Sequence, residues 1–218
     1  MSTSSEDSDI EVMYFGAPNR GCLPRLALYA GDVSFKDTVV SPQLLEELKA
    51  QGKAVFGSLP LMIHGGTTLA QSQAIAVYCA EIAGVIAPTP LTRAKDSMIT
   101  NTLEDISAGN IKIQGGPVEE KDIKIRALLD KFLPPIEAML PEIGSFFHGG
   151  DRPTLGDLAI FAITSYSHPK FGPTRGWVQH YPDWGDRFPK MIAIRDRVRT
   201  YPTLTPYFEK WGQFHIIA

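Results

Sequence analysis

The sequence predicts two domains, an α/β domain followed by an all-helical domain. In the first 84 residues, short apolar runs typical of strands alternate with stretches whose apolar residues recur at helical spacing. The proline-rich segment VIAPTPLTR (85–93) breaks this alternation, and after it the helical period continues almost to the end of the chain. We therefore expect a disordered polar tail over 1–9, the α/β domain over 10–84, a linker over 85–93 and the helical domain over 94–218.

The α/β domain is predicted to have the element order β-α-β-α-β-β-α. Gly31 and Gly84 are placed to end helices. Ser41 and Pro42 are placed to begin one, as N-cap and first residue, and the glycine pair at 65–66 predicts a hairpin turn. In chain order the elements are the strand EVMYFG (11–16), the helix LPRLALYAG (23–31), the strand FKDTVV (35–40), the helix QLLEELKA (43–50), the hairpin LPLMIHGGTTLAQ (59–71) and the helix QSQAIAVYCAEIAG (71–84).

The second domain is predicted to consist of long amphipathic helices. In PTLGDL, Thr154 stands three residues before Asp157 at the start of an apolar run, which is an N-capping pattern. We interpret it as a folding element, worth about 0.5–2 kcal/mol by the usual cost of losing a cap. The expected helices cover 92–109, 119–140, 154–167 and 189–199.

Composition excludes several classes of protein. A net charge of −3 argues against nucleic acid or an anionic membrane as partner. The first nine residues have no apolar core of a signal peptide, and the longest apolar run, LAIFAI (158–163), is too short to span a bilayer. Neither the two cysteines, Cys22 and Cys79, nor the five histidines show metal-ligand spacing. We therefore expect a soluble cytoplasmic protein without a metal site.

A tyrosine stands where the first strand meets the first helix, in YFGAPNRGCLPRLAL (14–28). A helix N-terminus offers free backbone N–H groups and the positive end of the helix dipole, so it favours anions. The hydroxyl of Tyr14, beside a helix start that carries Arg20 and Cys22, is placed to stabilise a thiolate, an oxyanion or a carboxylate. The alternative is that Tyr14 is simply an aromatic at the end of a buried strand. These residues alone leave both interpretations open.

Three more positions have a structural and a functional interpretation. The Leu59-Pro60 bond is expected to be trans, because cis X–Pro bonds are the minority; a cis bond would turn the backbone outward to pair with an extended peptide. Ser72 is either a plain N-cap or, with Gln71, a carboxylate site at a helix N-terminus. Cys22 is either a nucleophile or, since no Cys-x-x-Cys or Cys-Pro motif surrounds it, an ordinary buried thiol, which we favour.

Taken together, these motifs resemble the glutathione S-transferase superfamily, and most closely its sigma-type, tyrosine-dependent branch, which includes the glutathione-dependent prostaglandin D synthases. The branch has a tyrosine-phenylalanine pair with arginines six and eleven residues after the tyrosine, and Tyr14-Phe15, Arg20 and Arg25 fit this spacing. FGSLP and LAQSQAIAVYCA are similar to the family's FGxLP and QSxAIxRYLA. The resemblance implies a thioredoxin-like N-terminal domain and an all-helical C-terminal domain.

The resemblance also implies a set of site residues. Tyr14 is implied to stabilise the glutathione thiolate, with Arg20 nearby, and these two are the candidate catalytic residues. Lys49 is implied to face the glycyl carboxylate, and Leu59 to pair its backbone with the cysteinyl unit. The implied glutathione-binding residues are Tyr14, Arg20, Lys49, Ser58, Leu59, Pro60, Gln71 and Ser72, with Glu104 and Asp105 of NTLEDI (101–106) reaching the γ-glutamyl amine from a partner subunit.

Three features depart from the family pattern. Leu45 stands where a tryptophan is usual near the glycyl end, and two extra residues fall in 50–55. The segment 168–189, with Trp177, Tyr181 and Trp184, is longer than its counterpart and is expected to be an ordered loop that shapes the electrophile pocket.

The function implied is that of a homodimeric, cytoplasmic glutathione transferase. Glutathione would be the cosubstrate, a hydrophobic small molecule the electrophile, and no metal, nucleic acid or membrane would take part. Three alternatives stay open: a glutathione-dependent isomerase using the same site, a non-catalytic glutathione-binding interaction protein, and a thiol transferase based on Cys22.

Overall fold

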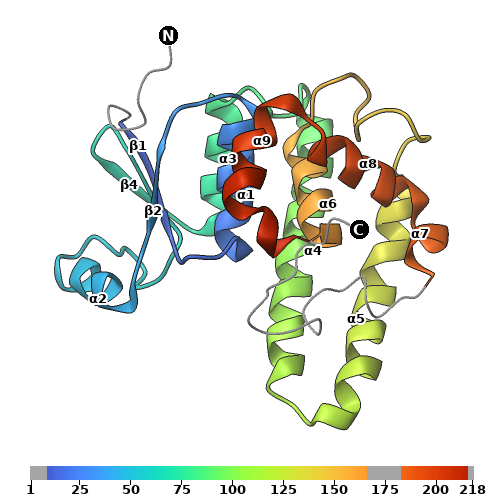
Figure 1. Ribbon diagram of the computed structural model, residues 1–218, viewed down its shortest axis with the longest axis horizontal. Coiled ribbons are helices and arrows are strands. Elements are labelled where there is room, and N and C mark those ends of the chain that lie inside the picture. The colour runs from blue at the N-terminus through green and yellow to red at the C-terminus, as the bar shows by residue number, and fades with distance from the viewer. Residues whose placement is uncertain (1–8, 166–182, 216–218) are drawn as a thin grey trace. The chain divides into compact units, whose positions relative to one another are not determined.

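The computed structural model describes residues 9–165 and 183–215 (Figure 1). The predicted tail therefore lies outside the described residues, apart from its last position, and so do Trp177 and Tyr181 of the predicted loop. The chain divides into two compact units. The first unit runs to Ile86 and includes Pro202–Trp211; the second unit comprises Ala87–Tyr201 and the residues from Gly212 onward. The helical domain predicted over 94–218 thus lacks a segment near its end, which packs with the first unit instead.

A mixed four-stranded sheet organises the first unit, in the order β2-β1-β3-β4. Strand β1 runs parallel to β2 and antiparallel to β3, which pairs antiparallel with β4. The predicted element order is confirmed. Its members are β1 (Ile10–Tyr14), α1 (Cys22–Ala30), β2 (Lys36–Val39), α2 (Pro42–Ala50), β3 (Leu61–His64), β4 (Thr67–Ala70) and α3 (Ser72–Ile82).

Turn and cap residues act largely as predicted. Ser41 Oγ accepts the Leu44 N–H at 3.1 Å and Pro42 is the first helical residue of α2. Gly65 and Gly66 have φ of 54° and 77°, as a tight hairpin turn requires. Gly31 ends α1 for another reason: its φ is −90°, but a Cβ there would lie 2.3 Å from the Ala83 carbonyl oxygen. The glycine permits the close approach of α1 to the end of α3.

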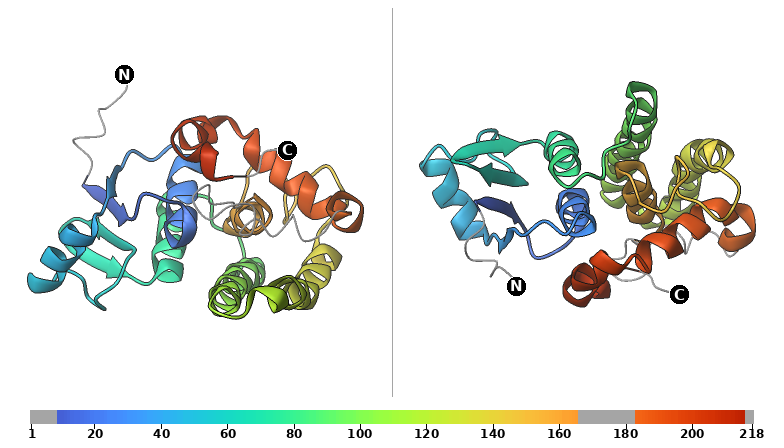
Figure 2. Two further views of the ribbon diagram at one scale, coloured as in Figure 1. Left: turned by 60° about the horizontal axis from the view of Figure 1, so that its bottom comes forward. Right: turned by 90° about the horizontal axis from the view of Figure 1, so that it is seen from above.

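The second unit is built of helices. Its core is α6 (Leu155–Ser165), which packs against α4 and α8, and Figure 2 shows it between those two helices. None of the helices within the described ranges is both long and apolar enough to cross a membrane. The helices of the unit are α4 (Pro90–Gln114), α5 (Val118–Met139), α6, α7 (Trp184–Arg187) and α8 (Pro189–Arg199).

The expected linker over 85–93 was too long. Residues 90–93 form the first turn of α4, because Pro90 occupies the first helical position, where a missing N–H costs nothing. Thr89 and Thr92 cap this turn reciprocally, each side chain accepting the other's backbone N–H, at 3.2 Å and 3.0 Å.

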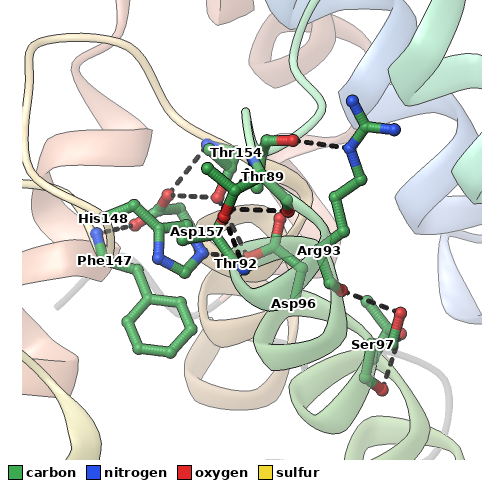
Figure 3. Close-up of polar contacts among 11 residues, drawn as sticks. Thr89, Thr92, Arg93, Asp96, Ser97, Phe147, His148, Thr154 and Asp157 are labelled. Atoms are coloured by element: carbon green, nitrogen blue, oxygen red, sulfur yellow. Dashed lines mark hydrogen bonds and ion pairs between the residues drawn. The ribbon is translucent and has the colours of Figure 1, made fainter.

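The N-capping pattern of α6 is confirmed and extended by the structure (Figure 3). Asp157 accepts the backbone N–H groups of Phe147 at 2.7 Å and Thr154 at 2.8 Å, and lies 3.0 Å from Thr154 Oγ1. A second buried carboxylate, Asp96 of α4, lies 2.7 Å from His148 Nε2 and 3.2 Å from the same threonine hydroxyl. The cap therefore joins α6 to α4 and to the loop before α6.

Candidate functional site

The sheet register brings the predicted site segments of the first unit together. Tyr14 is the last residue of β1, and its neighbour Met13 pairs with Leu61 at the start of the antiparallel strand β3. Leu61 also pairs with Ala70, the last residue of β4. Since Leu59-Pro60 enters β3 and Gln71 leaves β4, both lie at the same end of the sheet as Tyr14.

Tyr14 is buried, with 6% of its surface exposed. It belongs to a core cluster with Leu48 and Leu59, and its carbonyl accepts the Val40 N–H at 2.8 Å. The ring also lies against the start of α1: a Cβ at Gly21, the residue before this helix, would meet ring atoms of Tyr14 at 2.8 Å. Tyr14 is thus a core aromatic and at the same time the neighbour of a helix N-terminus.

Arg20 lies in the short 3₁₀ turn Asn19–Gly21 that leads into α1, and its side chain is exposed. The turn has no side-chain cap, and Gly21 provides none for α1. The structure therefore places Arg20 at the start of a helix that has no side-chain cap, six residues after the buried Tyr14 in the sequence.

Cys22 does not have the surroundings of a nucleophile. Its side chain is buried with 3% exposure, and Sγ lies 3.3 Å from the Tyr207 hydroxyl. Burial raises the pKa of the Cys22 thiol to about 11, despite the opposing effects of that hydrogen bond and of Arg25. The structure thus supports the interpretation of Cys22 as a structural thiol.

The Leu59-Pro60 peptide bond is cis, so the expectation of a trans bond was wrong. Leu59 packs in the core cluster of Tyr14, while Ser58 is exposed. Nothing in the neighbouring sequence, FGSLP, indicates that this bond is cis.

Gln71, and not Ser72, is the N-cap residue of α3, so the plain N-cap interpretation of Ser72 was wrong. Gln71 has φ 75° and ψ 113°, and its side chain makes no capping hydrogen bond. A non-glycine residue at positive φ costs about 1–3 kcal/mol, and such residues cluster at ligand sites. Ser72 is the half-buried first residue of α3. No feature of the sequence signals this backbone conformation.

Leu45 and Lys49 lie one helical turn apart on α2 and differ in burial. Lys49 is exposed, 2.7 Å from the Glu46 carboxylate, and a Cβ at Gly57 would lie 4.0 Å from its Cε, so its stem runs beside the segment that precedes Ser58. Leu45 is half-buried and packs against the core cluster of Tyr14. The position where the family usually has tryptophan is therefore filled by a packing residue.

Glu104 and Asp105 lie on α4 of the second unit, half-buried and exposed respectively. The role implied for them is one toward a partner subunit, and it stays a prediction. Among the residues described, no three His, Cys, Asp or Glu side chains are grouped closely enough to hold a metal ion.

The family match found by comparison with known proteins lies within the first unit. Residues 10–81, from β1 to the last turn of α3, match the family described as glutathione S-transferase, N-terminal domain. Over these residues the chain belongs to that family. The predicted fold class, a thioredoxin-like α/β domain followed by a helical one, is thereby confirmed.

The likeness to other glutathione S-transferases extends over nearly the whole chain. Glutathione S-transferase alpha M14 of Sus scrofa is 24% identical over 205 residues, covering 92% of this chain and 88% of that protein. Hematopoietic prostaglandin D synthase of Gallus gallus is 25% identical over 158 residues, covering 71% and 73%. The crystal structure of the glutathione S-transferase from Ascaris lumbricoides superposes with a TM-score of 0.75 at 25% identity, covering 92% of this chain and 96% of that one.

Proposed function

We propose that this protein is a glutathione transferase that holds the glutathione thiol as a thiolate for attack on a hydrophobic electrophile. The observation that supports this most directly is the sheet register, which gathers Tyr14, Leu59-Pro60 and Gln71-Ser72 at one end of the sheet. All of them lie within the residues that match the glutathione S-transferase N-terminal domain.

The chemistry requires a modest electrostatic effect. A cysteine-type thiol with a pKa near 8.5 is only a few per cent ionised at pH 7. Lowering that pKa by about two units requires about 2.7 kcal/mol of preferential stabilisation of the thiolate. A hydrogen bond to a charged acceptor contributes about 1.5–3 kcal/mol. One such bond from the Tyr14 hydroxyl, aided by the adjacent start of α1 and by Arg20, is of the required size.

The rest of the tripeptide would lie along the same end of the sheet. The backbone of Leu59, next to Ser58 and Pro60, pairs with the cysteinyl unit. Gln71 and Ser72 hold the γ-glutamyl carboxylate, since α3 begins at Ser72 and the positive end of a helix dipole favours an anion. Lys49 faces the glycyl carboxylate from α2.

A homodimer completes the proposal, with Glu104 or Asp105 of the partner subunit near the γ-glutamyl amine. Val55 and Phe56, in the loop between α2 and β3, are 53% and 64% exposed. Neighbouring exposed apolar side chains of this size mark interaction surfaces. We assign this loop to the contact between two copies of the chain, in a protein that acts in the cytoplasm.

A second candidate function is glutathione-dependent isomerisation at the same site. It is favoured by the similarity to the prostaglandin D synthase of Gallus gallus, and with the Tyr14-Phe15, Arg20 and Arg25 spacing it supports the sigma-type branch. The alpha-named relatives, such as that of Sus scrofa, favour conjugation. Product analysis with a prostaglandin endoperoxide and with a chlorinated aromatic electrophile separates the two reactions.

The test is Tyr14→Phe, which keeps the buried ring and removes the hydroxyl. Turnover is expected to fall by about 10²-fold, the scale of losing one oxyanion-type donor. The pKa of the bound glutathione thiol, obtained from thiolate absorbance between about pH 5 and 9, is expected to rise toward that of free glutathione. Tyr78→Phe is the matched control, since the Tyr78 hydroxyl pairs with His64 at 2.9 Å, and it should retain turnover. Unchanged turnover in Tyr14→Phe would remove Tyr14 from the mechanism.

Glutathione binding to the unmodified protein without any lowering of the thiol pKa would favour the non-catalytic interaction protein. Absence of binding would show that the fold is retained without its site.

A further inference from the structure

A buried arginine lies next to Tyr14, the residue proposed to donate to the thiolate. Arg25 of α1 is fully buried, and its guanidinium contacts three elements of the first unit. Nε donates to Asp37 Oδ1 of β2 at 2.8 Å, and Nη1 donates to the carbonyl of Ala17 at 3.0 Å. Ala17 lies in the segment between Tyr14 and Arg20. A single side chain therefore connects the second strand to the loop that carries Arg20.

The same guanidinium lies next to Tyr14. Its Cζ is 5.8 Å from the centre of the Tyr14 ring. Gly21 fills the remaining space, because a Cβ there would meet the ring at 2.8 Å and Arg25 Nη1 at 3.0 Å. The Tyr14 ring and the guanidinium thus lie close together on the same side of Gly21, and there is no room for a larger residue between them.

The closing segment, Pro202–Trp211, covers the guanidinium from the other side. Arg25 Cζ lies 4.2 Å from the centre of a Trp211 ring, and its Nη2 has no hydrogen-bond partner among the described residues. Trp211 Nε1 donates to Asp37 Oδ2 at 3.2 Å, and Lys210 Nζ lies 2.9 Å from the same oxygen. Figure 1 shows α9 (Thr205–Trp211), the helix of this segment, beside α1.

We propose that Arg25 is a positioning residue of the candidate thiolate site. It holds the Tyr14 ring through the guanidinium and, through the carbonyl of Ala17, the segment that leads to Arg20. The planar guanidinium donates in two directions at fixed angles while its face stacks on an indole; a lysine ammonium has the charge and the donors but no planar face to stack. The closing segment fixes the guanidinium through Trp211 and Asp37. This inference rests on the proposed function, because the group that Arg25 positions is the donor to the thiolate.

The other titratable groups around the guanidinium are Asp37, Cys22, Tyr29, Tyr207 and Lys210. Burial raises the pKa of Cys22 to about 11, raises the pKa of Tyr29 and raises the pKa of Tyr207 well above its ordinary value. These three groups stay neutral between about pH 5 and 9. A titration in that range with glutathione bound therefore does not come from them.

The experiment is a pH titration of the thiol of bound glutathione in the Arg25→Lys variant, which keeps the positive charge but replaces the planar guanidinium by an ammonium group. The thiol pKa is expected to rise by about one unit, from about 6.5 to about 7.5, and kcat at about pH 6.5 to fall about fivefold, because the thiolate fraction falls with it. The KM for glutathione should stay within about threefold, since the two ends of the tripeptide bind elsewhere. An unchanged thiol pKa in a folded Arg25→Lys protein would overturn the inference.

Lys210→Met is the matched control, because Lys210 also contacts Asp37 but is 41% exposed and touches neither Tyr14 nor its loop in the contacts described. It is expected to leave the thiol pKa within about 0.3 unit, as for a screened surface charge. An equal shift in Lys210→Met would assign the effect to the charge of the cluster and overturn a positioning role.

If Arg25→Lys does not fold, as judged by circular dichroism, Gly21→Ala takes its place, since it displaces the guanidinium from the Tyr14 ring without changing charge. A folded Gly21→Ala with an unchanged thiol pKa overturns the inference. Unmodified protein that fails to lower the thiol pKa refutes the proposed function itself, and so the two failures are distinguishable.

Discussion

The strained backbone conformation of Gln71 is expected to lower the stability of the folded protein at a position that we propose binds glutathione. At φ 75° and ψ 113°, its Cβ imposes a strain of about 1–3 kcal/mol that a glycine would relieve. At ordinary positions glycine is less stable than alanine by about 0.5–1 kcal/mol. The two effects oppose each other, so Gln71→Gly should be more stable than Gln71→Ala, by up to about 2 kcal/mol.

Urea unfolding followed by circular dichroism measures this difference. Gln51 provides the control, because it is also a glutamine that flanks a helix, as the C-cap of α2, but has an ordinary φ of −82°. There the glycine variant should be the less stable of the pair. If Gln71→Gly is also less stable than Gln71→Ala, by the usual 0.5–1 kcal/mol, the backbone at Gln71 is not strained and the reasoning fails.

Glutathione binding gives the other half of the prediction. Both Gln71 variants lose the side chain proposed to hold the γ-glutamyl end, so the Kd should rise about tenfold in each, equivalent to about 1.4 kcal/mol. Binding that is unchanged in Gln71→Ala would remove this side chain from the site, while leaving the strain argument intact.

Four further outcomes are expected. Asp157→Ala should lower the free energy of unfolding by about 2–4 kcal/mol, because the buried N–H of Phe147 and the half-buried N–H of Thr154 lose their acceptor, whereas Thr154→Ala should cost about 0.5–2 kcal/mol, as measured by urea unfolding. Burial raises the pKa of Asp157 to about 6 in the folded protein, so the folded state binds its proton more tightly than the unfolded chain. The free energy of unfolding should then fall by about 2 kcal/mol as pH rises from about 4 to 6, and by about 3 kcal/mol over the whole titration, a slope that Asp157→Asn should flatten. Cys22 should react with a maleimide only on unfolding, and Cys22→Ser should retain transferase activity; rapid labelling of the folded protein would contradict its burial. Phe56→Ser should shift the protein from dimer toward monomer in analytical ultracentrifugation, and an unaltered dimer would move the interface elsewhere.

The predicted site residues differ in how well the sequence could place them. The sequence predicts that Tyr14 lies beside a helix start that carries Arg20 and Cys22, and the structure has the Tyr14 ring against Gly21, the residue before α1. That Arg25 lies beneath Tyr14 while Arg20 is exposed follows from packing on Asp37 and Trp211, which is remote in sequence.

By itself, the sequence determined the order of strands and helices, the caps at Ser41 and Thr154 and the family of the chain. These features depend on side chains within a few residues of one another, so a local pattern contains them. The tertiary structure alone decided the cis bond at Pro60, the positive φ of Gln71 and the return of Pro202–Trp211 to the first unit. The return of this segment depends on contacts between residues far apart in the chain, such as Trp211 with Arg25 and Asp37, which no local pattern contains.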